Sequence, residues 1–191
     1  MTVPESKNAD AATVETVVTY LEMTAPPHKL PPQPVGPRLA LMRVDMIPLH
    51  FYRYLYATIG HDWQWVERLD MDDDALAQNV QREGIEISVL YANGAPAGYY
   101  ELDLAGGETV DLVYFGLMPD WTGRKIGPWF LGCAVMEGFS GDAKRLTINT
   151  CTLDHPSALR LYQRIGFQPV RRETKDLVIP AGMPLPAHIR T

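Results

Sequence analysis

The sequence predicts a mixed α/β (α+β) domain in which antiparallel strands and amphipathic helices alternate. Asn93-Gly94 is a strong hairpin signal, and Gly106-Gly107 marks a second turn shortly after it. An apolar stripe at helical spacing within residues 153–167 predicts the best-defined helix of the chain. With 191 residues, the chain is long enough to bury one sizeable core.

The N-terminal part of the chain predicts two strands joined by a proline-rich connector. Residues 1–13 are small and polar, and we expect them to form a disordered tail. Residues 14–23 and 38–46 are rich in apolar and β-branched side chains and predict strands. Residues 25–37 contain six prolines, which excludes helix or sheet interior. We expect this connector to run extended over the surface.

Two helices are predicted next. In residues 48–60, Phe51, Leu55 and Ile59 recur at the spacing of one helix face. Residues 71–83 begin with aspartates, which are favoured in the first turn because of the helix dipole.

The clearest β region follows, with three antiparallel strands predicted at about 86–92, 96–104 and 108–117. Gly116 is unusual inside a strand. It indicates a bulge or a close approach of another part of the chain.

The last third predicts helix, strand, helix. A helix is expected at about 124–139, a strand at 145–151 and a second helix at 153–167. Asp154 or His155 is positioned to cap the second helix. Its apolar stripe consists of Ala158, Leu161, Tyr162 and Ile165.

The chain is expected to end in a terminal strand pair within residues 169–180. A single domain over residues 14–180 is therefore predicted, followed by a short tail at 181–191. No stretch approaches the roughly 20 apolar residues that span a bilayer, so no membrane association is expected.

Charge and cysteine content restrict the partners. The net charge of −6 argues against nucleic acid, which is bound through clustered Lys and Arg. Cys133 and Cys151 lie in apolar segments and are expected to be reduced, as in a cytoplasmic protein. The five histidines show no metal-ligand spacing, so no metal site is predicted.

The segment "WTGRKIGPWFLGCAV" (121–135) places two glycines and two cations where a helix begins. Helix starts present unpaired amides and a partial positive charge, so this segment predicts an anion site. A tight strand-to-helix turn with no ligand would use the same glycines, and both interpretations are open at this point.

Two motifs resemble the GNAT superfamily of N-acetyltransferases. "LMPDWTGRKIG" (117–127) is similar to the acyl-CoA loop of that family, and "HPSALRLYQRIGF" (155–167) to its Asn-x-x-Ala-x-x-Leu-Tyr-x-x-x-Gly-Phe helix. The resemblance covers roughly residues 38–175. Three positions depart from the family pattern: Thr122, Lys125 and His155.

The resemblance implies a mostly antiparallel central sheet flanked by helices, with a splayed strand pair for acyl-CoA. It also implies acetyl-CoA as co-substrate, its pyrophosphate held by the 123–127 turn. The residues expected to contact the cofactor are Leu117, Met118, Gly123, Arg124, Lys125, Ile126, Gly127 and His155.

Catalytic residues follow from the same resemblance. Tyr162 occupies the family's tyrosine position and would protonate the leaving thiolate. Asp111 precedes the loop where some members carry a base, with Glu101, Glu108 and water as alternatives. The aromatic set Tyr52, Tyr54, Tyr56, Trp63 and Trp65 could line the acceptor site or only pack.

The expected function is transfer of an acetyl group to a primary amine of a small molecule or peptide, by direct attack in a ternary complex. Three further readings stay open: a non-catalytic acyl-CoA-binding or interaction module, another acyl donor, and a homodimeric assembly. Cys151 as a nucleophile is disfavoured, because it ends an apolar strand and a thiol reacts as its thiolate.

Overall fold

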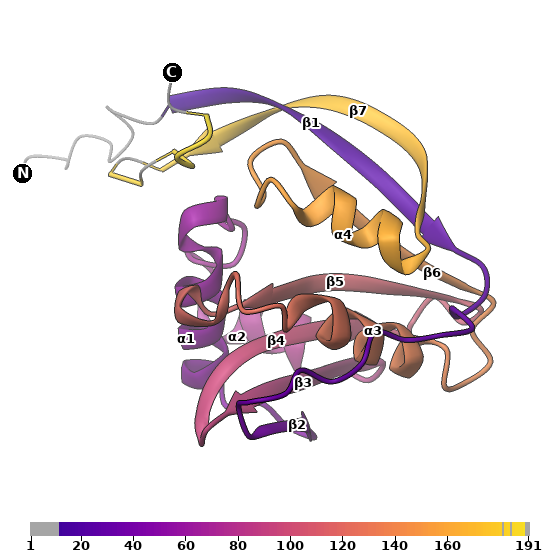
Figure 1. The fold of residues 1–191 in the computed structure, drawn as a ribbon. Coiled ribbons are helices and arrows are strands. Elements are labelled where there is room, and N and C mark those ends of the chain that lie inside the picture. Colours follow the sequence, from indigo (N-terminus) through magenta and orange to yellow (C-terminus); the bar gives the residue numbers. More distant parts are fainter. Residues whose placement is uncertain (1–11, 181, 184, 190–191) are drawn as a thin grey trace, which may run out of the picture.

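Seven strands form one sheet in the order β2-β3-β4-β5-β6-β1-β7 (Figure 1). The computed structural model describes residues 12–180, 182–183 and 185–189. All neighbouring strands are antiparallel except β5 and β6, which run parallel. The predicted mixed, mostly antiparallel sheet is confirmed. The strands are β1 (Ala12–Met23), β2 (Leu39–Val44), β3 (Ile85–Ala92), β4 (Ala95–Asp103), β5 (Thr109–Leu117), β6 (Arg145–Cys151) and β7 (Gln168–Ile179).

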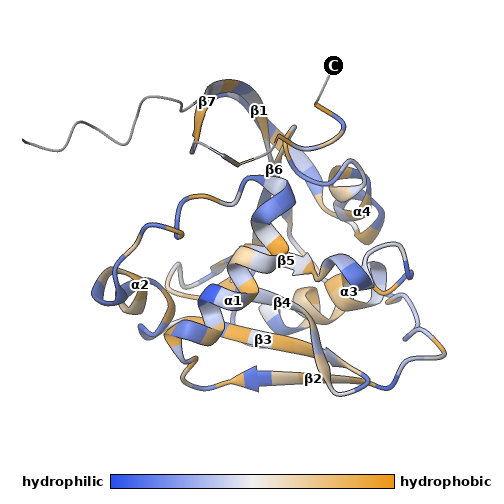
Figure 2. Ribbon diagram, turned by 90° about the vertical axis from the view of Figure 1, so that its left-hand side faces the viewer, coloured by the Kyte–Doolittle hydropathy of each residue, from blue (hydrophilic) through white to orange (hydrophobic). Residues whose placement is uncertain are grey.

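Helices cover both faces of the sheet. They are α1 (Leu49–Gly60), α2 (Asp73–Val80), α3 (Gly127–Gly138) and α4 (Ala158–Ile165). Tyr99 of β4 packs in one core with α1 and α2, whereas its neighbour Tyr100 packs in a second core with α3 and α4. Successive strand residues point to opposite faces, so the two helix pairs lie on opposite sides. Strand β3, between them, is strongly apolar (Figure 2).

The predicted hairpin and the two helices predicted before it are confirmed. Asn93 and Gly94 both have positive φ, at 53° and 92°, as a tight hairpin turn requires. The side chain of Asp72 caps α2 by accepting a 2.8 Å hydrogen bond from the Ala75 amide. The connector 25–37 contains neither helix nor strand, and Leu30 lies against Gly132 of α3.

The prediction of a terminal strand pair within residues 169–180 is wrong. Residues 168–179 form one strand, β7, and its partner is β1 from the other end of the chain. β1 also pairs with β6, so it lies between them in a long curved ribbon above α4 (Figure 1). Of the predicted tail, residues 1–11 lie outside the described residues, and β1 already begins at Ala12.

The two C-terminal helices begin later than predicted. α3 begins at Gly127 instead of 124, because Gly123 and Lys125 have positive φ. α4 begins at Ala158 instead of 153, and its N-cap Ser157 makes no side-chain capping bond. Ser157 therefore takes the N-cap position predicted for Asp154 or His155, although the His155 side chain accepts a hydrogen bond from the Ser157 amide.

Candidate active site

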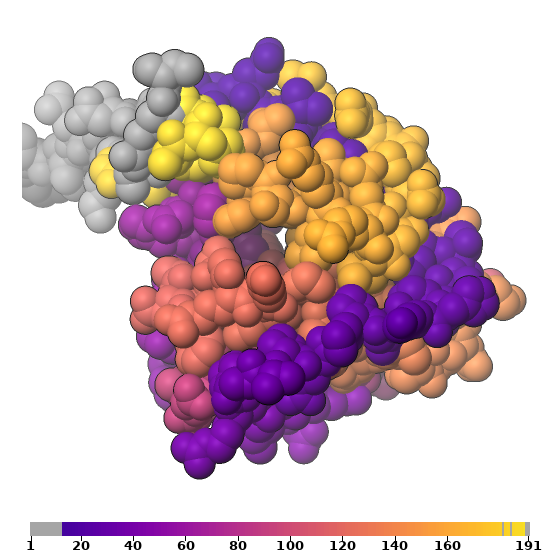
Figure 3. All heavy atoms as spheres, viewed as in Figure 1, coloured from indigo at the N-terminus to yellow at the C-terminus, as the bar shows by residue number. Residues whose placement is uncertain are grey.

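A cavity of about 890 Å³ opens where β5 and β6 separate. The two strands pair only over Thr109–Asp111 and Arg145–Thr147. Residues 112–117 of β5 and Ile148, Asn149 and Cys151 of β6 then line the cavity. Figure 3 shows the hollow between α4 and the loop that precedes α3. Along this stretch β6 no longer uses the peptide groups on the facing edge of β5.

Strand β5 is irregular at two places beside the cavity. The pairing with β4 shifts register so that Val113 bulges out between Leu112 and Tyr114. Gly116 keeps its pairing with Tyr99, but a Cβ there would lie 2.3 Å from Ile59 Cγ2. Gly116 therefore marks the close approach of α1, and the bulge lies three residues earlier.

The turn before α3 has the geometry of an anion-binding nest. Gly123 and Lys125 have φ of 77° and 61°, and Ile126 follows in the right-handed helical region. No hydrogen bond from the amides of residues 123–127 to any described residue is present. Successive free amides in alternating left- and right-handed conformations converge on an anion. The helix start adds a partial positive charge at the same place.

Not every residue predicted to contact the cofactor lines the cavity. Leu117, Gly123, Lys125, Ile126, Gly127 and His155 do. Of these, Ile126 is fully buried.

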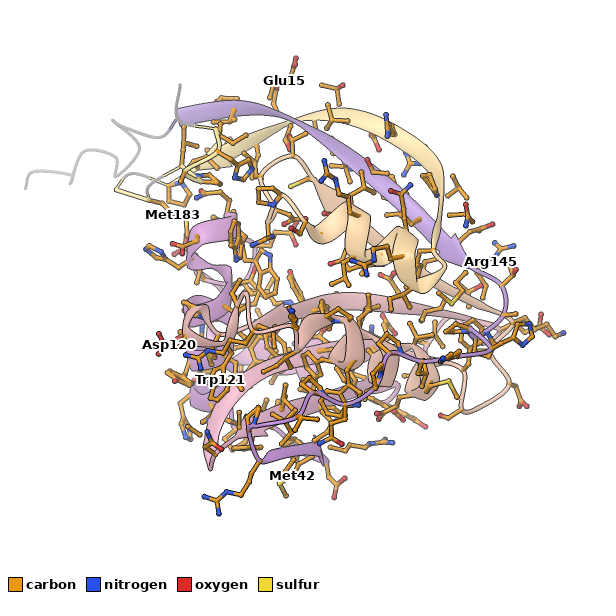
Figure 4. All side chains as sticks on the ribbon, in the orientation of Figure 1. Glu15, Met42, Asp120, Trp121, Arg145 and Met183 are labelled. Atoms are coloured by element: carbon orange, nitrogen blue, oxygen red, sulfur yellow. The ribbon has the colours of Figure 1, made fainter. Side chains whose placement is uncertain are left out.

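Met118 and Arg124 are placed elsewhere. Met118 is buried in the core beneath α1, and its amide donates to Ala97 O at 2.8 Å. The Arg124 guanidinium stacks on Trp121 at 4.9 Å, and its Nε donates to Asp120 O at 2.6 Å. Asp120 and Trp121 belong to a short 3-10 helix, Pro119–Trp121, between β5 and α3 (Figure 4). The Arg124 side chain instead lines a separate pocket of about 320 Å³ against the connector.

Tyr162 and residues of the turn line the same cavity. Tyr162 lines it from α4, and its hydroxyl makes no hydrogen bond within the described part of the chain. Burial raises the pKa of the Tyr162 phenol, and the carboxylate of Asp154 raises it further. The phenol is therefore protonated at neutral pH and able to donate.

His155 contributes a neutral ring to the cavity wall. Its Nδ1 accepts a 3.1 Å hydrogen bond from the Ser157 amide, and its ring meets Trp63 edge-on at 5.0 Å. Burial, and then the nearby His188, lower the pKa of His155.

The structure leaves all three carboxylates proposed as bases outside the cavity lining. Asp111 accepts a 2.7 Å hydrogen bond from Thr147 Oγ1, where β5 and β6 are still paired. Glu101 is fully buried in a pair with Arg68. Glu108 is exposed and pairs with Lys144.

Only part of the aromatic set lines the cavity. Tyr56, Trp63 and Trp65 line the cavity. Tyr52 is buried and donates to Glu101 Oε2 at 2.9 Å, while Tyr54 is exposed.

Several residues that line the cavity are not among the predicted site residues. The sequence indicates Asp154 only as a helix cap, and it gives no sign of a role for Glu67, Tyr114 or Tyr20. Tyr20 arrives on β1, whose position beside β6 no local pattern predicts. Within the described segments, no cluster of three His, Cys, Asp or Glu side chains could hold a metal ion. No helix in those segments is long and apolar enough to cross a bilayer.

Comparisons with known proteins agree with this fold. A family model described as the acetyltransferase (GNAT) family matches residues 52–167. A GCN5-related N-acetyltransferase from Sphaerobacter thermophilus superposes with a TM-score of 0.61 at 15% identity, over 92% of this chain and 55% of that one. An IAA acetyltransferase from Bacillus cereus has a TM-score of 0.54 at 21% identity, over 70% of this chain and 79% of that one.

The lengths of the similar structures differ from that of this chain. The chain spans 63%, 55% and 61% of three of them, which is less than two thirds in each case. No curated protein gives a significant match.

A mostly antiparallel sheet that splits between two parallel strands, with a turn of free amides lining the split, is consistent with the fold of the acetyltransferase structures that it resembles. The family model covers more than half of the sequence. The chain belongs to the GNAT acetyltransferase family.

Proposed function

We propose that this protein transfers an acetyl group from acetyl-CoA to a primary amine of a small molecule or peptide, by direct attack in a ternary complex. The observation that carries the proposal is the row of free amides at residues 123–127 on the rim of the same cavity that Tyr162 lines. The turn would hold the diphosphate of acetyl-CoA, and Tyr162 would supply the proton that the leaving thiolate needs.

The residues of the turn fit a coenzyme A pyrophosphate. Amides from Gly123 to Gly127 would donate hydrogen bonds to its oxygens, with the Lys125 ammonium beside them. Lys125 adopts positive φ as the position requires, although only glycine does so without steric cost. The pantetheine arm would then run along Leu117 between the splayed strands.

The peptide edge of β5 and the Tyr162 phenol supply the two polar functions of an acyl-transfer site. Amides on the unpaired stretch of β5 can stabilise negative charge on a thioester oxygen. Tyr162 can donate its proton to the departing thiolate.

Direct attack is favoured over an acyl-cysteine intermediate. Cys151 lines the cavity, but burial raises the pKa of its thiol, and the Asp154 carboxylate raises it further. A thiol held protonated is a poor nucleophile.

Two measurements test the proposal. Calorimetric titration with acetyl-CoA should give saturable binding, and a panel of primary amines should include one that triggers release of free coenzyme A. Tyr162→Phe should keep acetyl-CoA binding and lose about 10²-fold in release rate. Tyr54→Phe makes the same chemical change at an exposed position outside the cavity and should leave both unchanged.

Other outcomes separate the alternatives. Binding of acetyl-CoA without release for any amine would indicate a non-catalytic acyl-CoA-binding module. Faster release from propionyl-CoA than from acetyl-CoA would change the donor. Absence of acetyl-CoA binding would refute the proposal.

A further inference from the structure

Three carboxylates of the described residues line the cavity, and only that of Asp154 is not exposed. Glu67 and Asp176 are exposed, and Glu67 accepts a 3.2 Å hydrogen bond from Tyr114. Asp154 is half-buried and lines the same cavity as Tyr162, and its charge raises the pKa of the Tyr162 phenol. It comes from the loop between β6 and α4, so it reaches the cavity where the strands are splayed.

The carboxylate of Asp154 is held in place by its own strand. Its Oδ2 accepts hydrogen bonds from Thr150 Oγ1 at 2.6 Å and from the Cys151 amide at 2.9 Å. The side chain of Trp65, which also lines the cavity, lowers the pKa of Asp154 and so favours its charged form. A carboxylate fixed by several donors is preorganised in the way that a catalytic base requires.

Burial and hydrogen bonding shift the pKa of this carboxyl group in opposite directions. Burial raises the pKa of Asp154, and the bonds from Thr150, Cys151 and Trp65 lower it by a smaller total. The other titratable groups that face it are Cys151 on β6, Tyr162 on α4 and His188 in the C-terminal segment. A raised pKa makes Asp154 a stronger base than a solvated aspartate.

We propose that Asp154 is the proton acceptor of the acyl transfer, working in one cavity with Tyr162 as proton donor. The inference rests on the acetyl transfer proposed above. It assigns the role that Asp111, Glu101 and Glu108 are not placed to perform.

Atoms and protons balance in the resulting step. The neutral amine nitrogen forms a bond to the thioester carbonyl carbon and becomes acidic as it gains positive charge. Asp154 takes one proton from this nitrogen, directly or through one water. The C–S bond breaks with its electron pair on sulfur, and Tyr162 donates a proton to that thiolate. Asp154 then releases its proton to water, and Tyr162 recovers one from water.

A structural role for Asp154 predicts different results from a catalytic one. The bonds to Thr150 and Cys151 would also stabilise the loop, but an asparagine oxygen could accept them equally well. Asp154→Asn therefore keeps the loop contacts and removes only the ability to take a proton. Asp142→Asn, on an exposed loop outside the cavity, is the matched control.

Three readouts on the full chain test the assignment. Calorimetry should give Asp154→Asn the acetyl-CoA affinity of the parent protein. Coenzyme A release with an active amine should fall by about 10²-fold, and the acidic limb of its pH profile should disappear. In an infrared titration, Asp154→Asn should lack one carboxyl band that the parent protein shows. Asp142→Asn should keep the band of the cavity carboxyl group.

Thr150→Val provides a second variant that keeps the carboxyl group. Loss of the Thr150 bond should raise the pKa of Asp154 and move the acidic limb to higher pH. An Asp154→Asn protein that binds acetyl-CoA and keeps the parent rate and pH profile would overturn the assignment while leaving the acetyl transfer intact. If the parent protein releases no coenzyme A, the acetyl transfer itself fails and the assignment fails with it.

Discussion

The Arg68 guanidinium donates two hydrogen bonds to the Glu101 carboxylate, at 2.7 and 2.9 Å, and both side chains are buried. Arg68 follows the segment 63–67 that lines the cavity, while Glu101 lies two residues before the end of β4. The Arg68 guanidinium also lies over the ring of Tyr114, 4.7 Å from its centre. The pair therefore fixes one wall of the candidate site to the central sheet.

Breaking this pair should destabilise the fold strongly. Glu101→Gln keeps the shape of the side chain but leaves the Arg68 charge buried without a counter-ion, which costs about 3–5 kcal/mol. Urea unfolding measures the loss. Glu108→Gln removes a carboxylate from an exposed pair with Lys144 and should cost no more than about 1 kcal/mol. Equal losses in the two variants would contradict the role given to the buried pair.

The close approach of α1 to β5 leaves no room for a side chain at residue 116. In Gly116→Ala the new methyl group would meet Ile59, and we expect a loss of about 1–3 kcal/mol in thermal unfolding. Gly141→Ala, where a Cβ meets nothing within 4 Å, should stay within about 0.5 kcal/mol of the parent. The cost of Gly116→Ala should shrink in an Ile59→Ala background, and a cost that stays the same would exclude this clash as its cause.

Asp111 should make stability depend on pH. Burial raises its pKa in the folded protein above the ordinary value of 3.8, so the folded state holds the proton more tightly than the unfolded chain. Stability should therefore fall as pH rises through the window above 3.8, and the penalty should persist at neutral pH. Asp111→Asn removes this penalty and keeps an acceptor for Thr147.

Unfolding temperatures of Asp111→Asn and parent, followed from pH 7 to pH 3, measure this effect. The variant should be the more stable at pH 7, and the difference should vanish below the ordinary pKa of the carboxyl group. A variant that is less stable than the parent at pH 7 would show that the ionised carboxylate stabilises the fold.

The N-terminal strand should behave as part of the core. Leu21 of β1 is 1% exposed and packs in the same core as α3 and α4. Leu21→Ala should cost about 2–5 kcal/mol in urea unfolding. Val178→Ala on the neighbouring strand removes atoms from a side chain that is 59% exposed and should cost much less. Similar small costs at both positions would contradict the placement of β1 between β6 and β7.

Local signals predicted most elements because these elements depend on their own residues. The Asn93-Gly94 turn requires positive φ at both positions, and few other residue pairs adopt it easily. Phe51, Leu55 and Ile59 recur at helical spacing, and α1 forms over Leu49–Gly60. Errors arose where a helix start depends on a loop, as at Gly127 and Ala158.

The candidate site was predicted in part. The sequence indicated the 123–127 turn and Tyr162, which lie on the wall of one cavity. It favoured Asp111 as a base from its position along the chain. The structure instead places Asp154, from the loop between β6 and α4, in the lining of the same cavity as Tyr162.

The sequence by itself determined the elements and the family, since hairpin turns, helical stripes and the two motifs are properties of neighbouring residues. Only the tertiary structure decided that β1 lies between β6 and β7, that Glu101 forms a buried ion pair with Arg68, and that Asp154 lines the cavity. These relationships join residues far apart in the chain, and they depend on which surfaces are buried together once the sheet has assembled.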